Sequence, residues 1–454
     1  MSEQKELARG LKNRHVQLLA IGGAIGTGLF LGSGRSIHLA GPSILLAYII
    51  TGIVCFFMMR ALGELLLSNP DNHSFVDVVY EYMGPGMAFV TGWTYWFCWI
   101  SLAMADVTAA GLYIQYWIPG VERWVPSLII LACLFLMNLM AVKVFGEMEF
   151  WFALIKVLAI LGLIVGGGFL IFTNFETNAG VASISNLWSY GGWFPKGWEG
   201  FVLSFQMVVF AFTGIELVGL TAGETENPEK VIPQAINNIP LRIIIFYVGA
   251  LAVIMSIYPW TTVSPDKSPF VQVFGAAGIL AAASLVNFIV LTSAASACNS
   301  GIFSTSRMVY ALAKEGNAPR IMFRLRSNKV PMNAVVFSAL VIFLAVILQY
   351  VTPEGVFVLI TSISTFCFIF IWVVIVLCHL RYRKSKAYRE GAHRFPMPLY
   401  PLMNYVIIGF FGFVVITLAF NAETRVALFF TPAWFGLLWC FYKLRISAKY
   451  TYFS

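Results

Sequence analysis

Apolar runs of about 20 residues recur from one end of this chain to the other, with no long polar segment between them. As a helix, each run is long enough to cross a hydrocarbon core of about 30 Å. Because a backbone in lipid must satisfy its own hydrogen bonds, such runs predict membrane helices. About twelve spans are expected, near residues 16–36, 42–67, 86–117, 124–143, 148–172, 199–222, 240–258, 276–312, 332–350, 354–379, 400–420 and 426–445.

The composition supports the same fold class. Of the 454 residues, 59% are hydrophobic and only 11% are charged, whereas soluble domains carry roughly 25% charged residues. We therefore expect an all-α integral membrane protein with one polytopic membrane domain and no soluble domain. The first span follows a charged start and lacks a small-residue cleavage site, so we do not expect a removable signal peptide.

The net charge of the chain is +8, and most of the basic residues that produce it are clustered in a few segments. They gather in 5–14, 314–329, 381–394 and 443–449, before the first predicted span and after the eighth, tenth and last. All these segments fall on one side if the span count is right, which predicts that both termini are cytoplasmic. The basic loops are topology signals that can also touch anionic lipid, and no nucleic-acid partner is expected.

Cysteine and histidine positions point to no further chemistry. All seven cysteines fall within predicted spans, so they indicate no disulfide framework. The five histidines have no partner at ligand spacing. We expect no metal site and no cofactor.

The stretch IGGAIGTGLFLGSG, residues 21–34, places six glycines inside the first apolar run. Glycine costs roughly 1 kcal/mol relative to alanine in a helix interior, so the helix should break here. A second half-helix starting near Thr27 would offer N–H groups, and a first half ending near Ala24 would offer carbonyls. These two ends suit the carboxylate and the ammonium of a free amino acid. Alternatively, the glycines serve close helix packing, because Gly22/Gly26 and Gly28/Gly32 have small-xxx-small spacing.

Four of the charged residues in the first five predicted spans are candidates for an ion pair or a functional site. Arg60 and Glu64, one turn apart, are predicted to form an interfacial ion pair, with a gate contact as the alternative. Asp106 lies deep in the third span and should face the substrate ammonium, a proton site or a neighbouring helix. Lys156 lies about eight residues into the fifth span. It is a candidate proton carrier, or a lysine that snorkels or forms a fixed ion pair.

A second interruption is predicted in the sixth span, at Phe212, Thr213 and Gly214, with Glu216 just beyond. Interrupted spans five apart are what two inverted repeats of five helices would give, with a site between the two interrupted members. The alternative is a lone glycine kink. The eighth span carries small and hydroxyl residues from Ser293 to Ser306, which favour close helix approach or a hydrated path.

Five stretches of the sequence together resemble the amino acid permeases of the amino acid-polyamine-organocation superfamily. They are GGAIGTGLFLGSG, MRALGELL, FGEMEFWFALIKVLAI, FAFTGIELVGLTAGETENPEK and TSAASACNSGIFSTSRM. The resemblance covers almost the whole chain. Further stretches, such as GWTYWFCW, GGWFPKG and AINNIPLRIIIFYV, are most similar to the bacterial permeases for D-serine, D-alanine and glycine. These motifs are specific for the family and less so for the substrate.

The resemblance implies a leucine-transporter-like fold. It would have a first repeat over about 16–172, a second over about 199–379 and two extra helices over about 400–445. It implies that the substrate carboxylate meets amides of Thr27 and Gly28, and that the ammonium meets carbonyls of Ala24, Phe210 and Thr213. The implied substrate-binding set is therefore Ala24, Gly26, Thr27, Gly28, Phe210, Thr213 and Asp106. Lys156 matches a lysine that takes the place of a sodium ion in proton-coupled relatives, and Glu216 joins it as a proton-coupling candidate.

The expected function is a proton-coupled symporter that imports D-alanine, D-serine and glycine across the bacterial cytoplasmic membrane. Its expected partners are a small zwitterionic amino acid, the proton and the lipid bilayer, and no obligate protein partner is evident. An amino acid exchanger, or a permease for another zwitterionic amino acid, is the alternative. A channel lacks a ring of filter residues, and an enzyme lacks a nucleophile-base pair or metal cluster in the spans.

Overall fold

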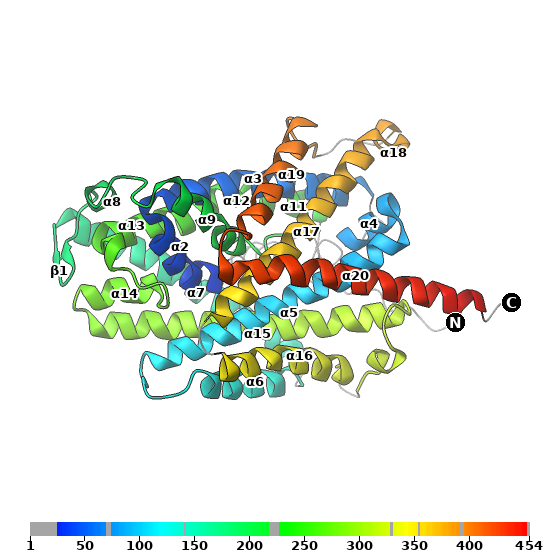
Figure 1. Cartoon of the computed structure of the whole chain (residues 1–454), viewed down its shortest axis with the longest axis horizontal. Helices are drawn as coiled ribbons and strands as arrows, with labels where there is room; N and C mark the ends of the chain where they lie inside the picture. The colour runs from blue at the N-terminus through cyan, green and yellow to red at the C-terminus, as the bar shows by residue number, and fades with distance from the viewer. Residues whose placement is uncertain are drawn as a thin grey trace.

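The computed structural model describes residues 25–69, 74–139, 142–217, 227–326, 330–352, 355–390 and 395–451, and these are almost entirely helical (Figure 1). The first half contains η1 (Gly28–Gly32), α2 (Ser33–Ala40), η2 (Gly41–Ser43), α3 (Ile44–Ser68), α4 (Phe75–Met83), α5 (Pro85–Gln115), α6 (Trp124–Asn138), α7 (Val142–Phe172), β1 (Glu176–Thr177), β2 (Gly180–Val181), α8 (Asn186–Ser189) and α9 (Gly197–Phe210). The second half contains α11 (Pro228–Asn237), α12 (Ile239–Arg242), η4 (Ile243–Gly249), α13 (Ala250–Ile257), η5 (Trp260–Thr262), α14 (Pro269–Ala276), α15 (Leu280–Lys314), η6 (Arg320–Phe323), α16 (Met332–Val351), α17 (Val356–Lys384), α18 (Lys386–Glu390), α19 (Leu402–Thr417) and α20 (Ala422–Thr451).

Eight helical segments of the described chain are long and apolar enough to cross a membrane. They are Gly28–Ser68, Pro85–Gln115, Trp151–Phe172, Pro228–Ile257, Leu280–Lys314, Met332–Val351, Val356–Lys384 and Ala422–Leu444. Three shorter apolar helices, α6, α9 and α19, fall on other predicted spans. The expected all-α membrane fold is confirmed, and the only strands among the described residues form one short antiparallel hairpin, β1 with β2.

The segment Gly28–Ser68 covers two predicted spans, and the chain turns between them at Gly41. Gly41 has φ +62°, a backbone conformation that glycine adopts without strain, and Pro42 follows it. The turn separates α2 from α3, so each of the twelve predicted spans has a helical counterpart. Residues 16–24 of the first span lie outside the described residues.

Helix α5 runs through the middle of the bundle (Figure 1) and packs against α15, α17, α16, α6 and α4. Elements that lie five spans apart in the chain are neighbours in space. Helix α2 packs against α9, α3 against η4, and α5 against α15. The first and sixth spans, which carry the two predicted breaks, therefore lie side by side.

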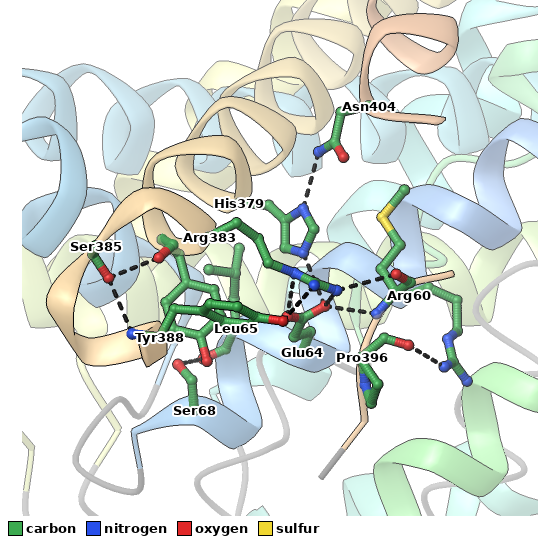
Figure 2. A network of polar contacts seen from close by, with 12 residues as sticks. Arg60, Glu64, Leu65, Ser68, His379, Arg383, Ser385, Tyr388, Pro396 and Asn404 are labelled. Carbon is green, nitrogen blue, oxygen red and sulfur yellow. Dashed lines mark hydrogen bonds and ion pairs between the residues drawn. The ribbon is translucent and has the colours of Figure 1, made fainter. Parts of the chain in front are cut away.

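A buried carboxylate ties the end of α3 to α17 and to the chain leading into α19 (Figure 2). Glu64 is 5% exposed, and its Oε2 accepts hydrogen bonds from Arg383 Nη2 at 2.9 Å and from the Met397 N–H at 2.6 Å. His379 Nε2 also lies 2.9 Å from this oxygen, and His379 Nδ1 lies 2.9 Å from Asn404 Nδ2 on α19. Because a buried carboxylate is stable only when paired and hydrogen-bonded, these contacts hold the three helix ends together.

The predicted ion pair between Arg60 and Glu64 is wrong. Arg60 instead donates from Nη1 to Asn237 Oδ1 at 3.1 Å and from Nη2 to the Pro396 carbonyl at 2.6 Å. An exposed pair one helical turn apart gains only about 0.3–0.5 kcal/mol. The ion pair of Glu64 with Arg383 lies in a more buried place and forms several bonds at once, so the tertiary partner prevails.

Candidate functional site

The first and sixth spans, which carry the two predicted breaks, touch directly; the described residues show the interruption of the sixth span and only the second half of the first. A Cβ placed on Gly28 would lie 2.6 Å from the Ala211 Cα and 3.1 Å from Phe210 Cδ1. Only glycine allows this approach, so the beginning of η1 contacts the end of α9. Four residues further on, Gly32 faces the Met207 side chain of α9 in the same way.

Each break has a defined helical end. In the sixth span, α9 ends at Phe210, residues 211–216 form turns, and Gly214 has φ +92°. The interruption predicted there is present. In the first span, the N–H groups of Leu29 and Phe30 both bond to the carbonyl of Gly26. Thr27 and Gly28 therefore stand at the N-terminal end of η1, where helix N–H groups point outward. Ala24, the predicted end of the first half, lies outside the described residues.

Asp106 holds the first break to α5. The Thr27 hydroxyl donates a hydrogen bond of 2.8 Å to Asp106 Oδ1, and both side chains are 1% exposed. The second carboxylate oxygen, Oδ2, has no hydrogen-bond partner among the described residues. Such an orphaned oxygen is costly when buried, so it is available to a donor that enters the site.

Lys156 lies on α7 and is 1% exposed, one of the largest fully buried side chains of the described chain. Its ammonium is close enough to Asp106 for the two charges to attract. Burial argues against the snorkelling alternative, because the lysine does not reach the surface of the protein. A buried lysine and a buried carboxylate thus lie beside the first break, and ionisable residues inside a membrane span mark a candidate functional site.

Glu216 holds the sixth break. It is fully buried, and its Oε1 accepts a hydrogen bond of 3.2 Å from the Tyr95 hydroxyl, while Oε2 accepts one of 3.2 Å from Trp372 Nε1. Nearby, the Tyr247 hydroxyl donates to the Ala211 carbonyl at 3.0 Å. Three side chains from α5, α17 and η4 therefore satisfy the unwound segment. Sequence reasoning missed all three, because nothing local to a tyrosine or tryptophan in an apolar run shows which distant carboxylate or carbonyl it will meet.

Two residues of the implied substrate-binding set, Phe210 and Gly26, differ in their surroundings. The Phe210 carbonyl already accepts hydrogen bonds from the Thr213 N–H at 3.1 Å and from its hydroxyl at 2.7 Å. At Gly26, by contrast, an added Cβ would meet no atom of the described chain within 4 Å. No described residue therefore fills the space beside the Gly26 Cα.

A small cavity lies on one side of the two breaks. Its lining includes Arg35, Arg123, Gln349 and Phe357. The Phe357 ring packs edge-on against the Phe210 ring, with centroids 6.3 Å apart. The Phe357 ring therefore lines the cavity and also contacts Phe210, the last residue of α9. Among the residues that the structure describes, no group of three His, Cys, Asp or Glu side chains could hold a metal ion.

Comparison with known proteins places this architecture in a family. The family model described as amino acid permease matches residues 15–451. The chain is 66% identical to an uncharacterized transporter, YdgF, of Bacillus subtilis (97% of this chain and 96% of the relative). It is 64% identical to the amino-acid permease AapA of the same organism (98% and 96%). It is 52% identical to the D-serine/D-alanine/glycine transporter of Escherichia coli K12 (98% and 96%).

These relatives are named as transporters and permeases, not as enzymes, and they are bacterial. The match extends over nearly the whole chain and includes both breaks, Asp106, Lys156 and Glu216. It agrees with the multi-pass helical architecture and with the resemblance found in the sequence. The chain therefore belongs to the amino acid permease family.

Proposed function

We propose that this permease is a proton-driven symporter of small zwitterionic amino acids. The observation that carries the proposal is the burial of Lys156 and Asp106 beside two helix breaks that touch each other. A zwitterion needs a positive and a negative partner at short range, and a coupling site needs an ionisable group that water does not permanently solvate.

The proposed substrates are D-alanine, D-serine and glycine. The support is the 52% identity to the E. coli transporter that is named for them. The two B. subtilis relatives are more similar to the chain, but their names specify no substrate. An uptake panel with other zwitterionic amino acids as competitors would test this selectivity.

Each end of the substrate has a proposed partner. The carboxylate would bind the N–H groups of Thr27 and Gly28, where the helix dipole favours negative charge. The ammonium would bind Asp106 Oδ2, the orphaned acceptor, together with the carbonyls of Ala24 and Thr213. Phe210 would contribute its ring and, after rearrangement of Thr213, its carbonyl.

Lys156 is the proposed proton carrier. One charge that moves across about 100 mV provides roughly 2.3 kcal/mol, and each pH unit of gradient adds about 1.4 kcal/mol. Together these allow accumulation on the order of several hundredfold. Glu216, the second predicted coupling residue, has both oxygens occupied by donors, so its proposed role is to hold the sixth break while the proton moves elsewhere.

The proposed topology follows from the charge pattern. Both termini and the basic segments would face the cytoplasm, with the protein in the bacterial cytoplasmic membrane. The contacts between elements five spans apart support two inverted repeats over about 16–172 and 199–379, with α19 and α20 as the extra helices.

The test is uptake of labelled D-alanine into proteoliposomes without sodium, with and without an inward proton gradient. We expect accumulation above the equilibrium level only with the gradient, and suppression by unlabelled glycine and D-serine. Lys156→Ala should abolish the accumulation. Full accumulation by that variant would refute the role of Lys156, and uptake that requires amino acid inside the vesicles would identify an exchanger.

A further inference from the structure

Three buried polar atoms of α5 and α15 lack a hydrogen-bond partner in the described chain. They are Asp106 Oδ2, the Tyr113 hydroxyl and the Ser293 hydroxyl, on side chains that are 1%, 3% and 1% exposed. A buried polar group left without a partner is destabilising, because it has lost its hydrogen bonds to water. Native proteins satisfy nearly all such groups, and ordered water does so where protein does not.

The three atoms lie along one helix pair. Helices α5 and α15 are antiparallel neighbours, because Gly301 faces Ala103 while the Asn287 side chain donates to the Tyr113 carbonyl at 2.9 Å. Ser293 therefore falls at a level between Asp106 and Tyr113. Helix α15 also packs against α7, which carries Lys156.

Tyr113 and Asp106 share a face of α5. The two residues are seven positions apart, which is about two helical turns, or about 10.5 Å along the helix axis. Helical side chains lean toward the N-terminus, so the Tyr113 ring leans toward Asp106. The groups that interact electrostatically with Asp106 are Tyr113 on α5, Cys298 on α15 and Lys156 on α7.

Tyr113 also stands near the end of its helix. Helix α5 ends at Gln115, and the loop that follows carries exposed Trp117 and Ile118. In the proposed topology this end faces the outside of the cell. Tyr113 thus places a buried hydroxyl without a partner in the described chain between the outer loop and Asp106.

We propose that Tyr113 and Ser293 are positioning residues of a hydrated path that carries protons from the outer end of α5 to the Asp106–Lys156 pair. The proposal rests on the proton-coupled function proposed above. In this path the two hydroxyls hold ordered water between them and Asp106. The proton passes along these hydrogen bonds to Lys156, and no group is consumed.

The test separates proton movement from substrate movement. Wild type, Tyr113→Phe and Ser293→Ala are reconstituted, and two rates are measured for labelled D-alanine. One is uptake driven by an inward proton gradient. The other is exchange against unlabelled D-alanine inside the vesicles at equal pH on both sides, which requires no net proton transfer.

We expect Tyr113→Phe to lower the gradient-driven rate about tenfold, the effect of losing one hydrogen bond of about 1.4 kcal/mol, and to leave exchange within about twofold of wild type. Ser293→Ala should act in the same direction. The matched control is Tyr48→Phe, because the Tyr48 hydroxyl is also buried without a partner in the described chain, but lies on α3 among aromatic rings. That variant should change neither rate.

Two results would overturn the path. Gradient-driven uptake at the wild-type rate in both Tyr113→Phe and Ser293→Ala would show that the hydroxyls carry no protons. An equal loss of both rates in Tyr113→Phe would assign that hydroxyl a structural role. If wild type itself shows no gradient-driven uptake while exchange is present, the proposed symport fails, and the path fails with it.

Discussion

Replacing Gly28 by alanine should separate the two helix breaks. The new methyl group would start 2.6 Å from the Ala211 Cα and would have to retreat by roughly 0.8 Å to reach an ordinary contact of 3.4 Å. The obstacle is backbone, which cannot rotate away, so η1 or the end of α9 must move. Overpacking of this kind costs about 1–3 kcal/mol. Because about 1.4 kcal/mol is a factor of ten, we expect D-alanine uptake to fall by roughly tenfold to a hundredfold.

The matched control lies one helical turn away. A Cβ on Gly32 would also be too close, 2.7 Å from Met207 Sδ, but this atom belongs to a flexible side chain that can move. Gly32→Ala should therefore keep most of the uptake. The two variants are compared by their initial rates of D-alanine uptake in proteoliposomes. Each rate is normalised to the amount of folded protein, which size-exclusion chromatography measures. Equal rates for Gly28→Ala and wild type would refute the close contact between the breaks, and equal losses in both variants would show that the type of obstacle does not matter.

Three other perturbations test separate parts of the structure. Glu64→Gln leaves the partly buried Arg383 without a carboxylate and should destabilise the protein by about 3 kcal/mol, whereas Arg60→Gln should cost about 1–2 kcal/mol. Thermal unfolding in detergent compares the two variants, and equal losses would contradict the network in Figure 2. Glu216→Gln turns an amide N–H toward one of two donors and should weaken D-alanine binding about tenfold or more; unchanged affinity in a direct binding assay would exclude its role at the sixth break. Replacing sodium by choline should leave uptake unchanged, because in the proposed function the Lys156 ammonium takes the place of a cation near the first break; sodium dependence in the flux assay would disprove this.

Local sequence features predicted most of the fold. Helix spans follow from the length of apolar runs, and the sixth break follows from Thr213 and Gly214 within one such run. Both are properties of a few adjacent residues. The structure accordingly has a helical counterpart for each predicted span, and α9 ends at Phe210, two residues before the predicted interruption.

Local sequence features could not predict which residues, distant in the sequence, contact the charged side chains inside the spans. The sequence shows that Asp106, Lys156 and Glu216 are buried charges in apolar runs, but it does not show what faces them. The hydrogen bond from Thr27 to Asp106 joins residues 79 positions apart. The Arg60–Glu64 prediction was wrong for the same reason, because helical spacing is only a weak preference that tertiary partners override.

Helix α5 contacts both breaks, and this limits how the site can open. Tyr95 bonds to Glu216 after the sixth break, and Asp106 bonds to Thr27 at the first. The two α5 residues are eleven positions apart, about three turns, so they lie on nearly the same face of one rigid helix. If η1 and α9 move together, as their contact at Gly28 favours, both hydrogen bonds must break or bend in the same step. In the proposed site, a substrate ammonium on Asp106 Oδ2 would share the carboxylate with the Thr27 hydroxyl on Oδ1. Substrate binding would draw the carboxylate's negative charge toward Oδ2 and weaken the hydrogen bond from Thr27, which would favour movement of the first break away from α5.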